Sequence, residues 1–171
     1  MIMNSKVKET AIPANSKIAE DVPGAYFYDC YQTPFPHEDL SAMQIYMDTF
    51  AKTPDWVNAL MGIRNRVVTL FGLKNVGRMK NMDKSKPPET YQVGDKAGIF
   101  SLVYKSDEEV ILCDSDKHLD VKVSVSKQNR DGQAFIALST VVHVHNNLGR
   151  AYMFFVGPAH KVIAPAVLAR A

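Results

Sequence analysis

The chain has 171 residues, of which 46% are apolar and 22% are charged, and its formal net charge is +2 at neutral pH. These values are typical of a single soluble globular domain over residues 1–171 and exclude a disordered chain. So small a net charge gives no electrostatic footprint for nucleic acid, which we do not expect as a partner.

The first part of the chain predicts a loose start followed by one strand. Residues 1–11 are largely polar, and we expect them to be loosely ordered. Aromatic side chains crowd residues 25–31, which is typical of a strand. The two prolines of residues 33–36 end this strand, because proline cannot donate to a sheet ladder.

Two helices are predicted next. Apolar side chains at helical spacing predict a helix over residues 39–50. A second helix runs from Pro54 to about Phe71, because Thr53 can cap it, Pro54 suits its first position and Gly72 can end it.

The second helix has two faces when its side chains are placed at 100° per residue. Arg64 falls on the apolar face, where its guanidinium needs a partner or a route to water. A route to water or an ion pair with Asp29 or Asp120 is the plain interpretation, and an anion hook for a ligand carboxylate is the alternative. The polar face comprises Asn58, Gly62, Asn65 and Thr69, and the apolar face, which we expect to be buried, comprises Val57, Leu60, Ile63, Val67 and Phe71.

After the prolines at 87–88 the spacing changes from helical to alternating. Apolar and polar side chains alternate over residues 119–126, which predicts a strand with one buried face and one wetter face. Short connections such as residues 129–132 favour an antiparallel meander. The four predicted strands cover residues 99–105, 110–114, 119–126 and 134–145.

The last segment, Leu148–Ala171, is apolar with helical spacing, and Asn147 can cap it. Pro158 and Pro165 lie inside this pattern, so we expect a kinked helix or two consecutive pieces. Together the elements predict an α+β domain, a curved antiparallel sheet wrapped around a long C-terminal helix, with two helices after the first strand. This order resembles the helix-grip fold of START and birch-pollen-allergen proteins, in which sheet and helix enclose a cavity.

Several short motifs along the chain together indicate a family. Their positions are Asp29, 54–57, 60–61, 64–65, 71–74, 118–120, 145–146, 148–150, Tyr152, Pro158 and His160. These motifs resemble those of an uncharacterised bacterial domain-of-unknown-function family with this helix-grip, polyketide-cyclase-like fold. The resemblance covers nearly the whole chain, and the same domain also follows short-chain-dehydrogenase-like domains in longer proteins. It implies the fold and supplies no activity.

The histidines are the candidates for chemistry. His143 and His145 lie two apart on one predicted strand and so share a face, which makes them weak candidates for a metal site without a third ligand. His118 and Asp120 can form a general base, but they alternate with the buried valines and so point away from the inner face. His160 falls on the inward side of the last helix, where we expect a satisfied core histidine or a catalytic base.

Arg64, Tyr28, Tyr152 and His160 are the residues that we expect to contact a ligand. The chain contains no hydrolase elbow, P-loop or zinc-protease motif, and we predict no cofactor and no resident metal.

Localisation follows from the cysteines and the N-terminus. Cys30 and Cys113 have no metal-ligand spacing, so we interpret them as buried apolar residues in a reducing cytoplasm. The N-terminus lacks the apolar stretch of a signal peptide, and the longest apolar run, Ala151–Val156, is too short to span a membrane.

Three functions are consistent with these observations. The first is binding of a small apolar or amphipathic ligand between the sheet and the last helix. The second is an enzyme, similar to polyketide cyclases or dehydratases, that uses a His or Asp general base. The third is a protein-interaction module without ligand, and pairing as a homodimer is left open.

Overall fold

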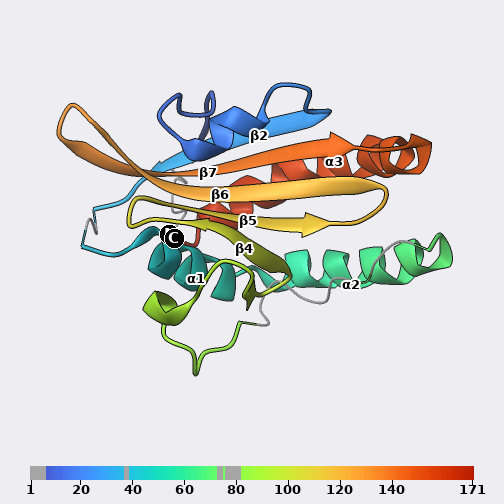
Figure 1. Ribbon diagram of the computed structural model, residues 1–171, viewed down its shortest axis with the longest axis horizontal. Helices are drawn as coiled ribbons and strands as arrows, with labels where there is room; N and C mark the ends of the chain where they lie inside the picture. The colour runs from blue at the N-terminus through green and yellow to red at the C-terminus, as the bar shows by residue number, and fades with distance from the viewer. Residues whose placement is uncertain (1–6, 37–38, 73–74, 76–81) are drawn as a thin grey trace.

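The protein is an α+β domain built on one antiparallel sheet, as predicted. The computed structural model describes residues 7–36, 39–72, 75 and 82–171 (Figure 1). The seven strands lie in the order β1-β2-β7-β6-β5-β4-β3. The strands are β1 (Lys8–Glu9), β2 (Phe27–Pro34), β3 (Lys96–Ala97), β4 (Phe100–Lys105), β5 (Glu109–Ser115), β6 (Leu119–Arg130) and β7 (Gln133–Val144). The helices are α1 (Ala42–Ala51), α2 (Asp55–Leu70) and α3 (Asn147–Leu168), with short 3₁₀ turns η1 (Lys17–Asp21) and η2 (Pro88–Thr90).

The differences from the predicted elements lie mainly at their ends. Asn146, not Asn147, caps α3, and its side chain accepts a hydrogen bond from the Gly149 N–H at 3.0 Å. The helix then continues as one element through Pro158 and Pro165. At the N-terminus, residues 1–6 lie outside the described part, whereas β1 pairs with β2 and is ordered by that pairing.

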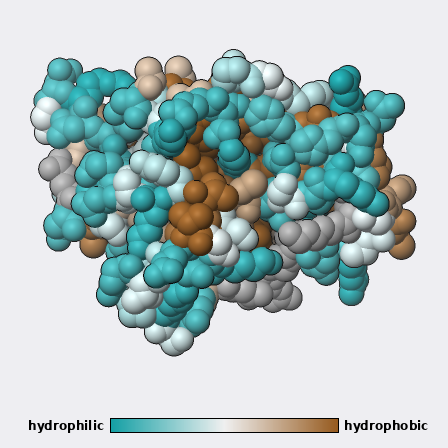
Figure 2. Space-filling view, viewed as in Figure 1, coloured by the Kyte–Doolittle hydropathy of each residue, from teal (hydrophilic) through white to brown (hydrophobic). Residues whose placement is uncertain are grey.

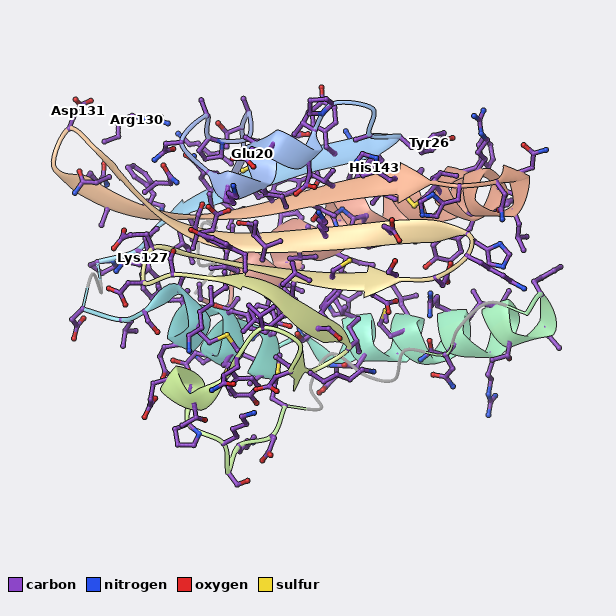
Figure 3. All side chains as sticks on the ribbon, viewed as in Figure 1. Glu20, Tyr26, Lys127, Arg130, Asp131 and His143 are labelled. Carbon is purple, nitrogen blue, oxygen red and sulfur yellow. The ribbon has the colours of Figure 1, made fainter. Side chains whose placement is uncertain are left out.

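The longest hairpin joins β6 to β7 and fixes the register at the centre of the sheet. Leu119 lies opposite Val144 at one end, and Arg130 lies opposite Gln133 at the other. Asp131 and Gly132 form the turn with φ angles of 53° and 76°, the left-handed pair that suits the twist of a tight hairpin. Figure 3 shows this turn at the far tip of the hairpin, away from α3.

The inner face of the sheet packs against α1 and α3 and forms the main core. Helix α3 lies behind β2 and β7 in the view of Figure 1. The predicted alternation of β6 is confirmed on this face, where Val121, Val123 and Val125 contribute to the core. The wetter face differs from expectation, because Ser124 and Ser126 are also buried.

The N-terminal segment covers part of this second, outer face. Ile18 of η1 packs against Ile111 and Val141 there. The buried carboxylate of Glu109 accepts hydrogen bonds from Ser16 Oγ, the backbone N–H groups of Lys17 and Ile18, and Ser124 Oγ, at distances of 2.6–3.3 Å. Figure 2 shows the outer face, which is mostly hydrophilic around a hydrophobic patch near its middle.

Helix α2 is rotated relative to its predicted orientation. It buries Val57, Asn65 and Val68. Val57 is buried as expected, but Leu60, Ile63, Val67 and Phe71 are largely exposed. Together with Trp56 and Leu70 these four residues form an apolar stripe along the helix. We call the following the α2 stripe: Trp56, Leu60, Ile63, Val67, Leu70 and Phe71, which are 42–83% exposed.

Helix α3 is the one helix among the described residues whose length and hydropathy suffice to cross a membrane. No membrane span was predicted from the sequence, because only unbroken apolar runs were considered. A window of 18 residues in α3 that allows up to two charged residues, such as Lys161, is apolar enough to pass the hydropathy test. This is weak evidence for a span, because a core helix passes the same test and Met153, Ala164 and Val167 of α3 pack inside the domain.

Candidate functional site: a cavity containing a histidine–aspartate pair

An apolar cavity lies between the inner face of the sheet, α3 and the middle of α2. Its volume is about 140 Å³, and it is partly open to solvent. Cavities of roughly 150 Å³ with apolar walls take up molecules the size of benzene. The polar side chains of the wall are Arg64, Asp114, Thr140, Tyr152 and His160, and the apolar side chains include Phe27, Phe50, Met61, Val121, Val123, Leu138, Val142, Met153, Val156 and Ile163.

A histidine–aspartate pair stands at the wall of this cavity. His160 comes from α3 and Asp29 from β2, 131 residues apart, and His160 Nδ1 lies 2.9 Å from Asp29 Oδ2. The Asp29 side chain is 2% exposed and that of His160 is 24% exposed. The sequence brings them together because Phe27, Asp29 and Tyr31 alternate onto the inner face, opposite the inward side of α3.

The pair fixes the tautomer of a neutral imidazole. A carboxylate only accepts hydrogen bonds, so the proton of a neutral His160 ring sits on Nδ1 and is donated to Asp29. Nε2 is then the acceptor, and it lies 3.4 Å from Thr140 Oγ1 of β7. The edge of Phe27 meets the ring at a centroid distance of 5.6 Å and an interplanar angle of 82°. Three contacts therefore hold the ring in one orientation.

Asp29 is deeply buried, although only one of its carboxylate oxygens has a side-chain partner among the described residues. Its second oxygen, Oδ1, is fully buried and has no hydrogen-bond partner among the described residues. Burying a carboxylate with few partners is unfavourable, which makes the contact with His160 important for folding.

A second polar group of the cavity wall, Arg64 with Tyr152, lies toward the N-terminal end of α3. Arg64 Nε of α2 donates to Tyr152 Oη at 2.9 Å, and the guanidinium also lies 5.4 Å from the centroid of that ring. Arg64 Nη1 donates to Asn65 Oδ1 at 2.9 Å as well. The proposed mates Asp29 and Asp120 are instead bonded to His160 and His145. Arg64 thus links α2 to α3 at the cavity wall.

The predicted ligand contacts are brought together only in part. Arg64, Tyr152 and His160 all line the cavity. Tyr28 does not, because it alternates with Phe27 and Asp29 onto the outer side of β2, where it is 56% exposed. Its expected place in a cavity beneath the helix was wrong.

His118 and Asp120 are neighbours, but they do not form the predicted pair with each other. The His118 ring contacts the side-chain amide of Asn146, with Nδ1 2.9 Å from Nδ2 and 3.2 Å from Oδ1. Asp120 contacts Ser115 Oγ and lies 3.0 Å from His145 Nε2. The backbone N–H of His145 donates to the His118 carbonyl at 2.8 Å, so all three residues meet at one end of the sheet.

His143 lies in β7 and His145 follows the last residue of that strand, and the two side chains have separate partners. His143 Nε2 lies 2.8 Å from the carbonyl oxygen of Asp21 (Figure 3). Among the described residues, no three His, Cys, Asp or Glu side chains are grouped so that they could hold a metal ion.

Two residues of the site escaped the sequence analysis. Thr140 was one polar position in an apolar strand. Asp29 was noted as a position that matches the family, and its only proposed partner was Arg64. The signal for Asp29 was its place between Phe27 and Tyr31, since a carboxylate at an inward position of a strand needs a partner from another element.

Comparisons with known proteins place the chain in a family without assigning it an activity. A family model described as protein of unknown function (DUF2867) matches residues 22–167. No curated protein and no solved structure matches the chain. The function must therefore be argued from the cavity itself.

Proposed function

Because the chain belongs to the DUF2867 family, whose description names no activity, we propose a function from the cavity: the protein binds a small, mostly apolar molecule with one polar end. The carrying observation is a cavity with apolar walls and polar groups at a few fixed places, which is the usual design of small-molecule sites. The order of elements, with the C-terminal helix across the inner face of an antiparallel sheet, supports the helix-grip interpretation of the fold.

The polar groups suggest how such a ligand lies. Tyr152 and His160 are eight residues apart on α3, or about 12 Å along the helix axis. Arg64 at the Tyr152 end favours an anionic or strongly accepting group. The apolar side chains between the two ends favour an aromatic ring or a short alkyl chain. We therefore expect the polar end of the ligand near Arg64 and its apolar body toward His160.

The test uses two probes of nearly equal shape, 3-phenylpropanoate and 3-phenylpropanol, with affinities measured by ligand-observed NMR. We expect Arg64→Met to weaken binding of the carboxylate about tenfold or more, because a hydrogen bond to a charged group contributes roughly 1.5–3 kcal/mol. Binding of the alcohol should change by less than about threefold.

Two variants separate the cavity from the surface of α2. Arg66→Met removes an exposed cation two residues away, and Leu70→Glu interrupts the α2 stripe, where Leu70 is 83% exposed. Both should leave the affinities unchanged. The proposal fails if neither probe binds, or if Leu70→Glu abolishes binding and Arg64→Met does not.

A further inference from the structure

The cavity contains an arrangement that ligand binding alone does not require. A single neutral polar group would orient an apolar ligand, whereas the protein buries the carboxylate of Asp29 behind an imidazole that faces the cavity. The cost of that burial is not repaid by further hydrogen bonds, because Asp29 Oδ1 has no partner among the described residues. What the carboxylate does provide is a fixed tautomer and a negative charge beside the ring.

We infer that His160 is a general base that removes a proton from a bound molecule, and that Asp29 is its positioning residue. The inference rests on the proposed function, because the substrate must enter the cavity. With its proton on Nδ1, the ring has its lone pair on Nε2, which lies 3.4 Å from the hydroxyl of Thr140, another residue of the cavity wall. A substrate C–H bond therefore reaches Nε2 by displacing this hydroxyl contact. When Nε2 takes a proton, the imidazolium forms 2.9 Å from a carboxylate that stabilises it.

The apolar surroundings define the class of substrate. The base acts beside the apolar side chains of Phe27 and Val142, so the molecule is small and mostly apolar, with a C–H bond acidified by a neighbouring electron-withdrawing group. The C–H bond breaks, its proton goes to Nε2, and its electron pair moves within the substrate onto the electron-withdrawing or leaving group. The proton then passes to water or back to another atom of the substrate, so the step needs no co-reactant.

The remaining histidines provide internal controls. His145 contacts Asp120 through Nε2 at nearly the same distance, 3.0 Å, but its side chain is 43% exposed and lies outside the cavity. His118 contacts Asn146, a neutral amide. Neither combines a buried carboxylate with a place at the cavity wall.

The test uses 5-nitrobenzisoxazole, a planar apolar probe that reports a general base in an apolar site. Removal of its C3 proton opens the ring: the C–H electron pair forms the nitrile, and the oxygen takes the electron pair of the breaking N–O bond, which gives a coloured cyanophenolate. A positioned base contributes about 10²–10⁴-fold, so we expect the wild-type chain to exceed an equal concentration of imidazole by at least about 100-fold. His160→Gln should lose most of this rate, whereas His145→Gln should keep it.

Binding of the probe is followed in parallel by saturation-transfer NMR, so that the two proposals fail separately. If the probe binds and wild type, His160→Gln and His145→Gln react equally fast, His160 is not a base although the cavity binds ligands. If the probe does not bind, the proposed function fails and the inference fails with it. Should His160→Gln not fold, the double variant Asp29→Asn/His160→Gln removes the unpaired charge and must be equally inactive.

The role of Asp29 needs a readout that a structural role would not change. Long-range ¹H–¹⁵N spectra show which ring nitrogen of His160 carries the proton. Asp29→Asn should lower the rate about tenfold or more and shift the ring away from the single Nδ1–H tautomer. A tenfold loss with an unchanged tautomer would show that Asp29 does not act through the imidazole.

Discussion

The protein contains two histidine–aspartate pairs of similar geometry in different surroundings. His160 meets Asp29 at 2.9 Å beneath the sheet, and His145 meets Asp120 at 3.0 Å at one end of the central strands. The first pair is 24% and 2% exposed, the second 43% and 31%. Distance alone therefore does not distinguish a reactive pair from a surface contact. Burial distinguishes the two pairs. Water screens the charges of the outer pair, whereas the buried carboxylate of Asp29 depends on His160 for its stabilisation.

The largest expected difference between the pairs is in stability. His160→Leu leaves the Asp29 carboxylate buried without its partner, and we expect the free energy of unfolding to fall by about 3–5 kcal/mol. His145→Leu breaks an exposed contact and should cost about 1 kcal/mol or less. Urea denaturation of both variants measures the difference.

A double variant tests the cause of that loss. Asp29→Leu/His160→Leu removes the buried charge together with its partner, so it should recover a large part of the lost stability. Equal losses for His160→Leu and His145→Leu would show that the two pairs are equivalent and that burial of Asp29 has no energetic effect.

A smaller difference is expected between a hydroxyl group at the cavity wall, that of Tyr152, and a hydroxyl group beside the outer pair, that of Ser115. Tyr152→Phe removes the acceptor of Arg64 Nε, which should lower the free energy of unfolding by about 1 kcal/mol and speed amide exchange in α2. Ser115→Ala removes the hydroxyl that contacts Asp120 on the surface and should change stability by less than about 0.5 kcal/mol. Amide exchange in α2 that is unchanged by Tyr152→Phe would show that Arg64 does not fasten this helix.

The least perturbing test uses the two cysteines, since each lies near one pair. Burial raises the pKa of the Cys30 thiol to about 11, so at pH 8 only about one molecule in a thousand carries the reactive thiolate. Burial, and secondarily the charge of Asp120, also raises the pKa of Cys113, but that side chain is partly exposed. Iodoacetamide followed by mass spectrometry should label Cys113 first and Cys30 only when the sheet opens. Faster labelling of Cys30 would contradict its burial.

Much of the fold could be predicted from the sequence, because strands and helices differ in apolar period. The alternation over residues 119–126 and the helical spacing after Asn147 identified β6 and α3 within a few residues. The orientation of α2 could not be predicted in this way. Its more apolar face carries Leu60 and Ile63, and the structure buries the face with Asn65 instead, so apolar content does not determine which face meets the domain.

The site was harder to predict, because its key contact joins residues 131 apart. The sequence identified His160 as facing inward and noted Asp29, but paired neither with the other. Alternation placed His118 and Asp120 on one strand face and suggested that they form a pair with each other. The alternation does not extend to His118, because His118 precedes the first residue of β6 and its ring contacts Asn146 instead. Local spacing finds neighbours along one strand and misses partners across a layer.

Glu109 has a consequence for where this domain begins. The family match starts at residue 22, whereas the donors from Ser16, Lys17 and Ile18 that satisfy the Glu109 carboxylate all precede it. A protein trimmed to the matched residues would retain β5 and its buried acid but lose most of the described bonds to it. The part of the chain that matches the family is therefore shorter than the part that the fold needs. A truncated protein that is intended to fold should keep the residues from β1 onward.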